Sequence, residues 1–137
     1  MRRLPAAIAA AVIFVLPLSA AAQQADANGL PPGIGPAQID AGAAIFRGRG
    51  NCFVCHGASG EGTMLGPALK GGEWLHIKGG FEEIVALVRS GVPKPVKFPA
   101  PMPEMGGAKL SDEELRAVAA YVWTLSRTGD GGAGGGS

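Results

Sequence analysis

The sequence Cys52-Phe53-Val54-Cys55-His56 decides what kind of fold this chain can adopt. The rest of the chain is poor in large core-building side chains, with five Phe, two Trp and one Tyr against 23 Gly and 11 Pro. A small domain of this composition gains only marginal stability from its own apolar surface. A disulfide between Cys52 and Cys55 would close too short a loop to constrain the unfolded chain much. We therefore expect a large apolar cofactor to stabilise the fold.

The spacing of these residues, C-x-x-C-H, is the attachment signature of a c-type haem. Two thiols at this spacing can bond to the two vinyl groups of the porphyrin. The adjacent imidazole is then carried under the ring, where one of its nitrogens can bind the iron. The motif predicts one covalent haem c attached at Cys52 and Cys55, with His56 as an axial ligand of the iron.

Three other interpretations compete with the haem. A thioredoxin-like C-x-x-C is expected beside a β-α-β pattern, and no strand pattern is found in this sequence. A zinc site usually needs four ligands, and Cys52, Cys55, His56 and His76 are the only Cys and His in the chain. A structural disulfide would not explain the adjacent histidine. The haem accounts for all three residues of the motif.

The first residues are typical of an export signal. Arg2 and Arg3 precede an apolar run over residues 6–18, and the small residues that follow indicate cleavage after Ala22. We expect residues 1–22 to be removed and the mature protein to act in the periplasm with no stable membrane span; a retained N-terminal anchor is the alternative. Cleavage would change the formal net charge from +1 to −1, and neither value suggests nucleic-acid binding.

Hydrophobic periodicity predicts three helices. Apolar residues recur at helical spacing from about Pro36 to an end between Arg47 and Gly50, over Phe81–Ser90, and from the N-cap Ser111 to Leu125. No segment shows the alternation of a strand. The prolines between residues 91 and 107 exclude helix and central strand and predict a stiff, extended loop. The expected fold is all-α, with three to four short helices and long loops organised by the cofactor.

The same patterns divide the chain into four parts. Residues 1–22 are the signal peptide, and residues 23–35, which show no periodicity, are expected to form a flexible leader. Residues 36–128 form the folded domain. The glycine-rich residues 129–137 have no apolar content to bury and are expected to be a disordered tail.

From about Ile39 to Leu125 the sequence resembles the monohaem class I cytochromes c of bacteria. The resemblance rests on an N-terminal helix, the C-x-x-C-H-G motif, a Gly-Pro-x-Leu loop, a Met-Pro loop and a C-terminal helix containing Ala-Tyr-Val. The first motif is highly specific, and the later ones are weak singly but follow in the family's order. The resemblance implies a class I cytochrome c-like fold around one covalently bound haem.

The resemblance also implies the second axial ligand of the iron. In that family it is the methionine of a Met-Pro step before the last helix, which corresponds to Met102 here; Met105 is the alternative. A thioether raises the reduction potential relative to a second imidazole. Met64 is expected to pack in a loop. His76, which would give a bis-His haem, is expected to be an ordinary surface residue.

Further pocket residues follow from the same resemblance. Gly66 and Pro67 resemble the loop over the histidine side, where the proline carbonyl accepts a hydrogen bond from the ligand imidazole. Phe46 and Tyr121 resemble the place near the haem where the first and last helices cross. Trp74 is a further pocket candidate that could cover the haem edge or hydrogen-bond a propionate through its indole N–H, although a single Trp in a loop is more often plain packing.

A glycine in the first predicted helix and two lysines beside the methionine loop are further candidates for a role near the haem. Gly42 would let the crossing helices approach closely, although a glycine inside a helix costs about 1 kcal/mol relative to alanine. Lys94 and Lys97 flank the methionine loop and could steer an acidic partner to the haem edge, but they are expected to be solvated surface charges.

With protein ligands on both sides of the iron, the expected function is single-electron transfer by a carrier, not catalysis. The partners would be a dehydrogenase, a respiratory complex or an oxidase. The alternatives are a cytochrome subunit of a periplasmic dehydrogenase complex, a ligand-binding haem sensor or peroxidase with a labile sixth position, and a haem-free thiol oxidoreductase.

Overall fold

The computed structural model describes residues 30–71 and 73–128. The predicted signal peptide, most of the predicted leader and the predicted tail lie outside these residues. Within them the chain forms no β-strand, so the all-α prediction of short helices and long loops is confirmed. The elements in chain order are α1 (Pro36–Arg47), α2 (Cys52–His56), α3 (Phe81–Ser90), the 3₁₀ helix η1 (Glu104–Gly107) and α4 (Asp112–Leu125).

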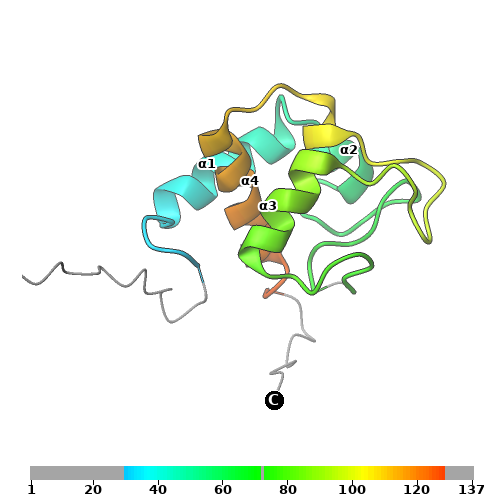
Figure 1. Cartoon of the computed structure of the whole chain (residues 1–137), viewed down its shortest axis with the longest axis horizontal. Coiled ribbons are helices and arrows are strands. Elements are labelled where there is room, and N and C mark those ends of the chain that lie inside the picture. Colours follow the sequence, from blue (N-terminus) through cyan, green and yellow to red (C-terminus); the bar gives the residue numbers. More distant parts are fainter. Residues whose placement is uncertain (1–29, 72, 129–137) are drawn as a thin grey trace, which may run out of the picture.

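Helices α1 and α4 cross with their backbones in close contact (Figure 1). Gly42 of α1 is buried at the crossing, and a Cβ atom built on it would lie 1.9 Å from the carbonyl oxygen of Ala117 in α4. No side chain fits in that space. The close approach expected at Gly42 is confirmed, and it explains why a glycine is tolerated inside a helix.

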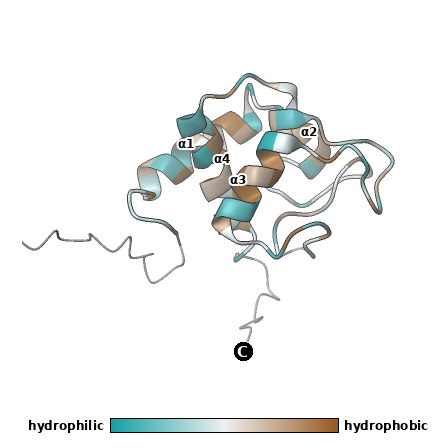
Figure 2. Cartoon of the chain, in the orientation of Figure 1, coloured by the Kyte–Doolittle hydropathy of each residue, from teal (hydrophilic) through white to brown (hydrophobic). Residues whose placement is uncertain are grey.

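The core lies where the apolar faces of α1, α3 and α4 meet. The side chains of Phe46, Ile84, Leu115 and Val118 are each less than 2 % exposed. Each of these helices also carries hydrophilic residues, as Figure 2 shows, which is typical of amphipathic helices that pack on one side. The three helices therefore form a packed body, and the long loops extend from it.

Local sequence signals account for the start of α4 and for the end of α3. Ser111 accepts a hydrogen bond from the backbone N–H of Glu114 (3.2 Å), and the Glu114 carboxylate accepts one from the backbone N–H of Ser111 (2.9 Å). This reciprocal pair is the predicted capping box. Helix α3 ends at Ser90 and is followed by the capping residue Gly91, whose φ of +66° is accessible to glycine without strain.

Between residues 91 and 107 the prediction of a simple extended loop is wrong in two places. Val92 and Met102 form an isolated antiparallel bridge, with N···O distances of 2.8 and 3.0 Å. The chain then turns into η1, where Met105 and Gly106 have φ of +50° and +68°. The last proline of the segment is Pro103, so the residues after it retain the N–H groups and the φ freedom that a turn needs.

The end of the predicted flexible leader also differs from expectation. Leu30 is only 4 % exposed, and Ile34 packs against the core. Leu30 and Ile34 thus attach residues 30–35 to the folded body, which two apolar residues separated by two prolines and a glycine do not indicate by periodicity. No helix in residues 30–71 and 73–128 combines the length and apolar character needed to cross a membrane.

Candidate haem site

The two cysteines lie on α2, a five-residue helix that periodicity could not predict because it is too short to show a repeat. Asn51, its N-cap, has a left-handed φ of +53°, which turns the chain sharply after α1. No disulfide joins Cys52 and Cys55, and both line one apolar cavity. Burial raises the pKa of the Cys52 thiol above its usual value, so this thiol is protonated at neutral pH.

His56 ends α2 and is 8 % exposed. Its Nδ1 atom lies 2.9 Å from the carbonyl oxygen of Pro67, which is the hydrogen bond that the family resemblance implies. A carbonyl can only accept, so Nδ1 donates and carries the proton. Burial lowers the pKa of the imidazole, which keeps it neutral at pH 7. The Nε2 atom therefore keeps the lone pair that a metal ligand requires.

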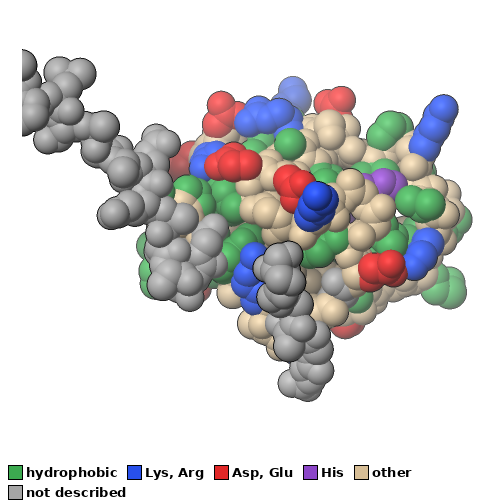
Figure 3. All heavy atoms as spheres, turned by 60° about the horizontal axis from the view of Figure 1, so that its bottom comes forward, with side chains coloured by type: hydrophobic (Ala, Val, Ile, Leu, Met, Phe, Trp, Pro, Cys, Tyr) green, Lys and Arg blue, Asp and Glu red, His purple; other side chains and the backbone are tan. Residues whose placement is uncertain are grey.

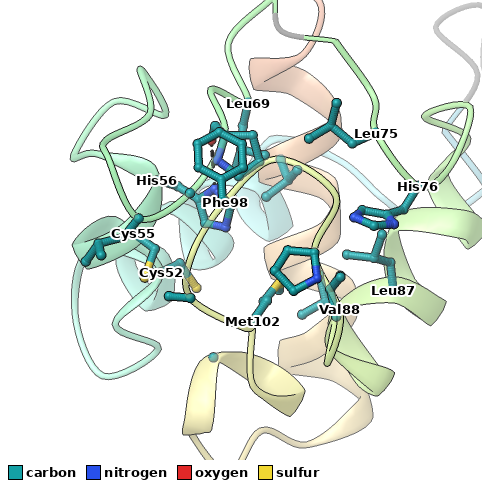
Figure 4. Close-up of a pocket in the computed structure, with 18 of the residues that line it drawn as sticks. Cys52, Cys55, His56, Leu69, Leu75, His76, Leu87, Val88, Phe98 and Met102 are labelled. Atoms are coloured by element: carbon teal, nitrogen blue, oxygen red, sulfur yellow. Dashed lines mark hydrogen bonds between the residues drawn. The ribbon is translucent and has the colours of Figure 1, made fainter.

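Met102 reaches the same cavity from a distant part of the chain. Its backbone is held by the bridge to Val92, just after α3. Figure 4 shows its side chain directed into the cavity that Cys52, Cys55 and His56 also line. Met105, the alternative ligand, packs against the core from η1 and is not among the residues that line this cavity.

The other predicted pocket residues are placed as follows. Phe46, Gly66, Pro67 and Trp74 line the cavity. Tyr121 does not line it: its ring packs edge-on against Phe46, with 5.3 Å between ring centroids, and so supports the wall from behind. The resemblance implies that both residues lie near the haem where the first and last helices cross; the two rings contact each other, but only Phe46 lines the cavity.

Several secondary candidates lie at the surface. His76 is exposed at the cavity rim (Figure 4), and Met64 is 88 % exposed. The expectation that Met64 packs in a loop is therefore wrong. Lys97 forms an exposed ion pair with Glu73, with 2.7 Å between Nζ and Oε2, so it is a paired surface charge.

The sequence does not predict one wall of the cavity. This wall consists of residues from α3 and from the proline-rich loop, namely Ile84, Leu87, Val88, Pro95 and Phe98. The apolar spacing of α3 identifies its buried face, but spacing within one helix does not say that this face borders a cavity. The loop residues have no periodicity, so their position depends on the tertiary fold.

This arrangement fits a covalent c-type haem. The cavity is lined mainly by apolar side chains, as a porphyrin requires, with two thiols and a neutral imidazole at one side and a thioether entering from another segment. A zinc site fits less well, because no group of three or more His, Cys, Asp or Glu residues comes together within the described part of the chain. The absence of strands there also disfavours a thioredoxin-like site.

Comparison with known families agrees with this geometry. Residues 37–122 match the family described as cytochrome c oxidase, cbb3-type, subunit III. Comparisons with curated proteins and with solved structures give no match. The matched segment spans α1 to α4 and contains the C-x-x-C-H motif and Met102. The chain therefore belongs to the cytochrome c family, as a class I monohaem cytochrome c domain whose function is haem-based electron transfer.

Proposed function

We propose that this protein is a periplasmic single-electron carrier whose haem iron is ligated by His56 and Met102. The observation that carries the proposal is the convergence of these two side chains on one apolar cavity from opposite halves of the sequence. Two protein ligands leave no open coordination position for a substrate. Outer-sphere electron transfer is the chemistry that such a site supports.

The residues around the site have separate tasks. A bound haem supplies an iron that alternates between the ferrous and ferric states. Pro67 holds the Nδ1 proton of His56, which fixes the orientation of the imidazole and increases its basicity. The thioether of Met102 favours ferrous iron and so raises the reduction potential. Ile84 and Val88 keep water from the cavity, because both are buried in the core.

The surface beside the haem-attachment helix suits short-lived contacts with redox partners. Phe53, Val54, Met64 and Leu65 are large apolar residues with 37–88 % exposure, and Val54 and Leu65 also line the cavity. Small interfaces are typical of transient electron-transfer encounters. Acidic and basic side chains are interspersed on the face of the molecule that Figure 3 shows.

The sequence supports the proposed location through its N-terminal signal pattern. The partners would be a dehydrogenase or a respiratory complex on one side and an acceptor such as an oxidase on the other. A second candidate is a cytochrome subunit of a terminal oxidase, which the description of the matched family favours. Stable co-purification with oxidase subunits would support the subunit, whereas recovery as a free monomer would support the carrier.

Replacement of the methionines tests the ligand assignment. Wild-type protein, produced in a host that attaches haem, should show a sharp c-type α-band when reduced and the weak far-red band of methionine-to-iron coordination when oxidised. Met102→Ala should abolish the far-red band and let carbon monoxide bind the reduced protein at neutral pH. Met105→Ala is the matched control and should retain the band. The reverse pattern would overturn the assignment of Met102.

A further inference from the structure

The segment between the haem-attachment helix and Pro67 is held to that helix by the side chain of Thr63. Its hydroxyl donates to the carbonyl oxygen of Cys55 at 2.7 Å and accepts from the backbone N–H of Leu65 at 3.0 Å. The Thr63 backbone N–H donates to the carbonyl of Gly66 at 3.0 Å. One residue thus joins the end of α2 to both sides of the turn that precedes Pro67.

This turn sits tightly against Cys55. A Cβ atom built on Gly66 would lie 3.0 Å from the Cys55 carbonyl oxygen and 3.2 Å from its Cβ atom, so the backbone of the turn touches the attachment residue. The Pro67 carbonyl follows directly and meets the Nδ1 atom of His56. The position of that carbonyl relative to the imidazole therefore depends on how the turn is fixed to α2.

Other contacts of this loop do not replace the Thr63 hydroxyl. Gly62 donates from its N–H to the His56 carbonyl at 2.7 Å, and Leu69 and Lys70 both donate to the Gly60 carbonyl. These bonds hold the two ends of the loop. Apart from the bond between His56 and Pro67 itself, the Thr63 hydroxyl makes the side-chain hydrogen bond that ties the intervening turn to α2.

We propose that Thr63 is a positioning residue that tunes the electron donation of the axial histidine. It acts through the turn at Gly66 and the Pro67 carbonyl and does not itself touch the iron ligands. This inference rests on the proposed function, because it requires His56 to be ligated. Thr63 is exposed, so it contributes little to the core. We therefore attribute its effect on the turn to the hydrogen bonds of its hydroxyl group.

The hydrogen bond between His56 and Pro67 determines in which direction the reduction potential changes. A strong bond from Nδ1–H to a carbonyl increases the basicity of the imidazole, which stabilises ferric iron and lowers the reduction potential. Removing the Thr63 hydroxyl loosens the turn and weakens that bond, so the potential rises. A tenfold change in the ferrous-to-ferric equilibrium corresponds to about 59 mV for one electron. We expect the reduction potential to rise by no more than this amount.

The experiment compares four variants of the haem-loaded protein. Thr63→Val and Thr63→Ala should both raise the reduction potential, speed amide exchange at Leu65, and shift and broaden the NMR signal of the His56 Nδ1 proton. Thr63→Ser retains the hydroxyl and should restore wild-type values. Thr124→Val removes a hydroxyl that bonds the Ala120 carbonyl within α4 at 2.9 Å, away from the cavity, and should leave all three measurements unchanged.

The outcomes separate this inference from the proposed function. Thr63→Val and Thr63→Ala proteins with an intact c-type spectrum, but with an unchanged potential and an unchanged Nδ1 signal, would overturn the role of Thr63 alone. A Thr63→Ser protein whose potential shifts as far as that of Thr63→Ala would also overturn it, because the hydroxyl would then not be the cause. A wild-type protein with no c-type spectrum would overturn both the proposed function and the role of Thr63.

Discussion

The close approach of α1 and α4 predicts a large effect for Gly42→Ala. The ideal Cβ position at residue 42 lies 1.9 Å from the Ala117 carbonyl oxygen, whereas ordinary contacts begin at 3.4 Å. The two helices must therefore separate by about 1.5 Å, because the atom that is struck belongs to the backbone and cannot rotate away. Overpacking of a core costs about 1–3 kcal/mol. We place this case at the upper end of that range, since a rigid backbone must move.

Against this cost stands the better helix propensity of alanine, about 1 kcal/mol. The net expectation for Gly42→Ala is a loss of about 2 kcal/mol in the free energy of unfolding. Urea unfolding of the haem-loaded protein measures it, as a lower midpoint at an unchanged slope. Gly35→Ala is the control, because it makes the same change at the N-cap of the same helix, where the nearest atom is the flexible Gln38 side chain at 3.7 Å. A loss at Gly42 no larger than at Gly35 would refute the reasoning.

Two further predictions concern polar contacts between side chains of different elements. Tyr121→Phe removes the hydroxyl that accepts a hydrogen bond from Nη2 of Arg47 (2.6 Å), and should cost about 0.5–1.5 kcal/mol in urea unfolding; an unchanged midpoint would contradict it. The hydrogen bond from Arg49, assisted by the Ser111 backbone N–H, holds the pKa of Glu114 below its usual value of 4.5. The stabilisation by Glu114 is thus present above pH 4.5 and is lost as the pH falls through the lower folded-state pKa. Thermal unfolding between about pH 3 and 6 should show a steeper loss of stability in the wild type than in Glu114→Gln; equal slopes would argue against this contribution.

The helices that sequence patterns locate well are those with local signals. The start of α4 is encoded within four residues by Ser111 and Glu114, and the end of α3 by one glycine at Gly91. Such signals act between neighbours in the chain, so they can be detected without knowing the fold. The C-x-x-C-H motif is of the same kind, because its chemistry depends only on adjacent residues.

The parts of the structure that sequence patterns do not predict depend on distant contacts. The bridge between Val92 and Met102 forms because the loop returns to the end of α3, and the burial of Leu30 depends on helices that come later in the chain. The resemblance places Tyr121 in the pocket, but its ring packs against Phe46, and only Phe46 lines the cavity. Spacing along one helix does not say which of two contacting rings, from two different helices, borders the cavity.

The Val92–Met102 bridge has a consequence for how this protein can vary. The bridge holds the two ends of the proline-rich loop together. Residues 93–101 are therefore fixed at one end just after α3 and at the other end at the backbone of Met102. Changes within that span can reshape the wall of the cavity that Pro95 and Phe98 form, while the backbone hydrogen bonds that hold Met102 remain in place. The shape of this wall can therefore vary without displacing the backbone of the proposed iron ligand.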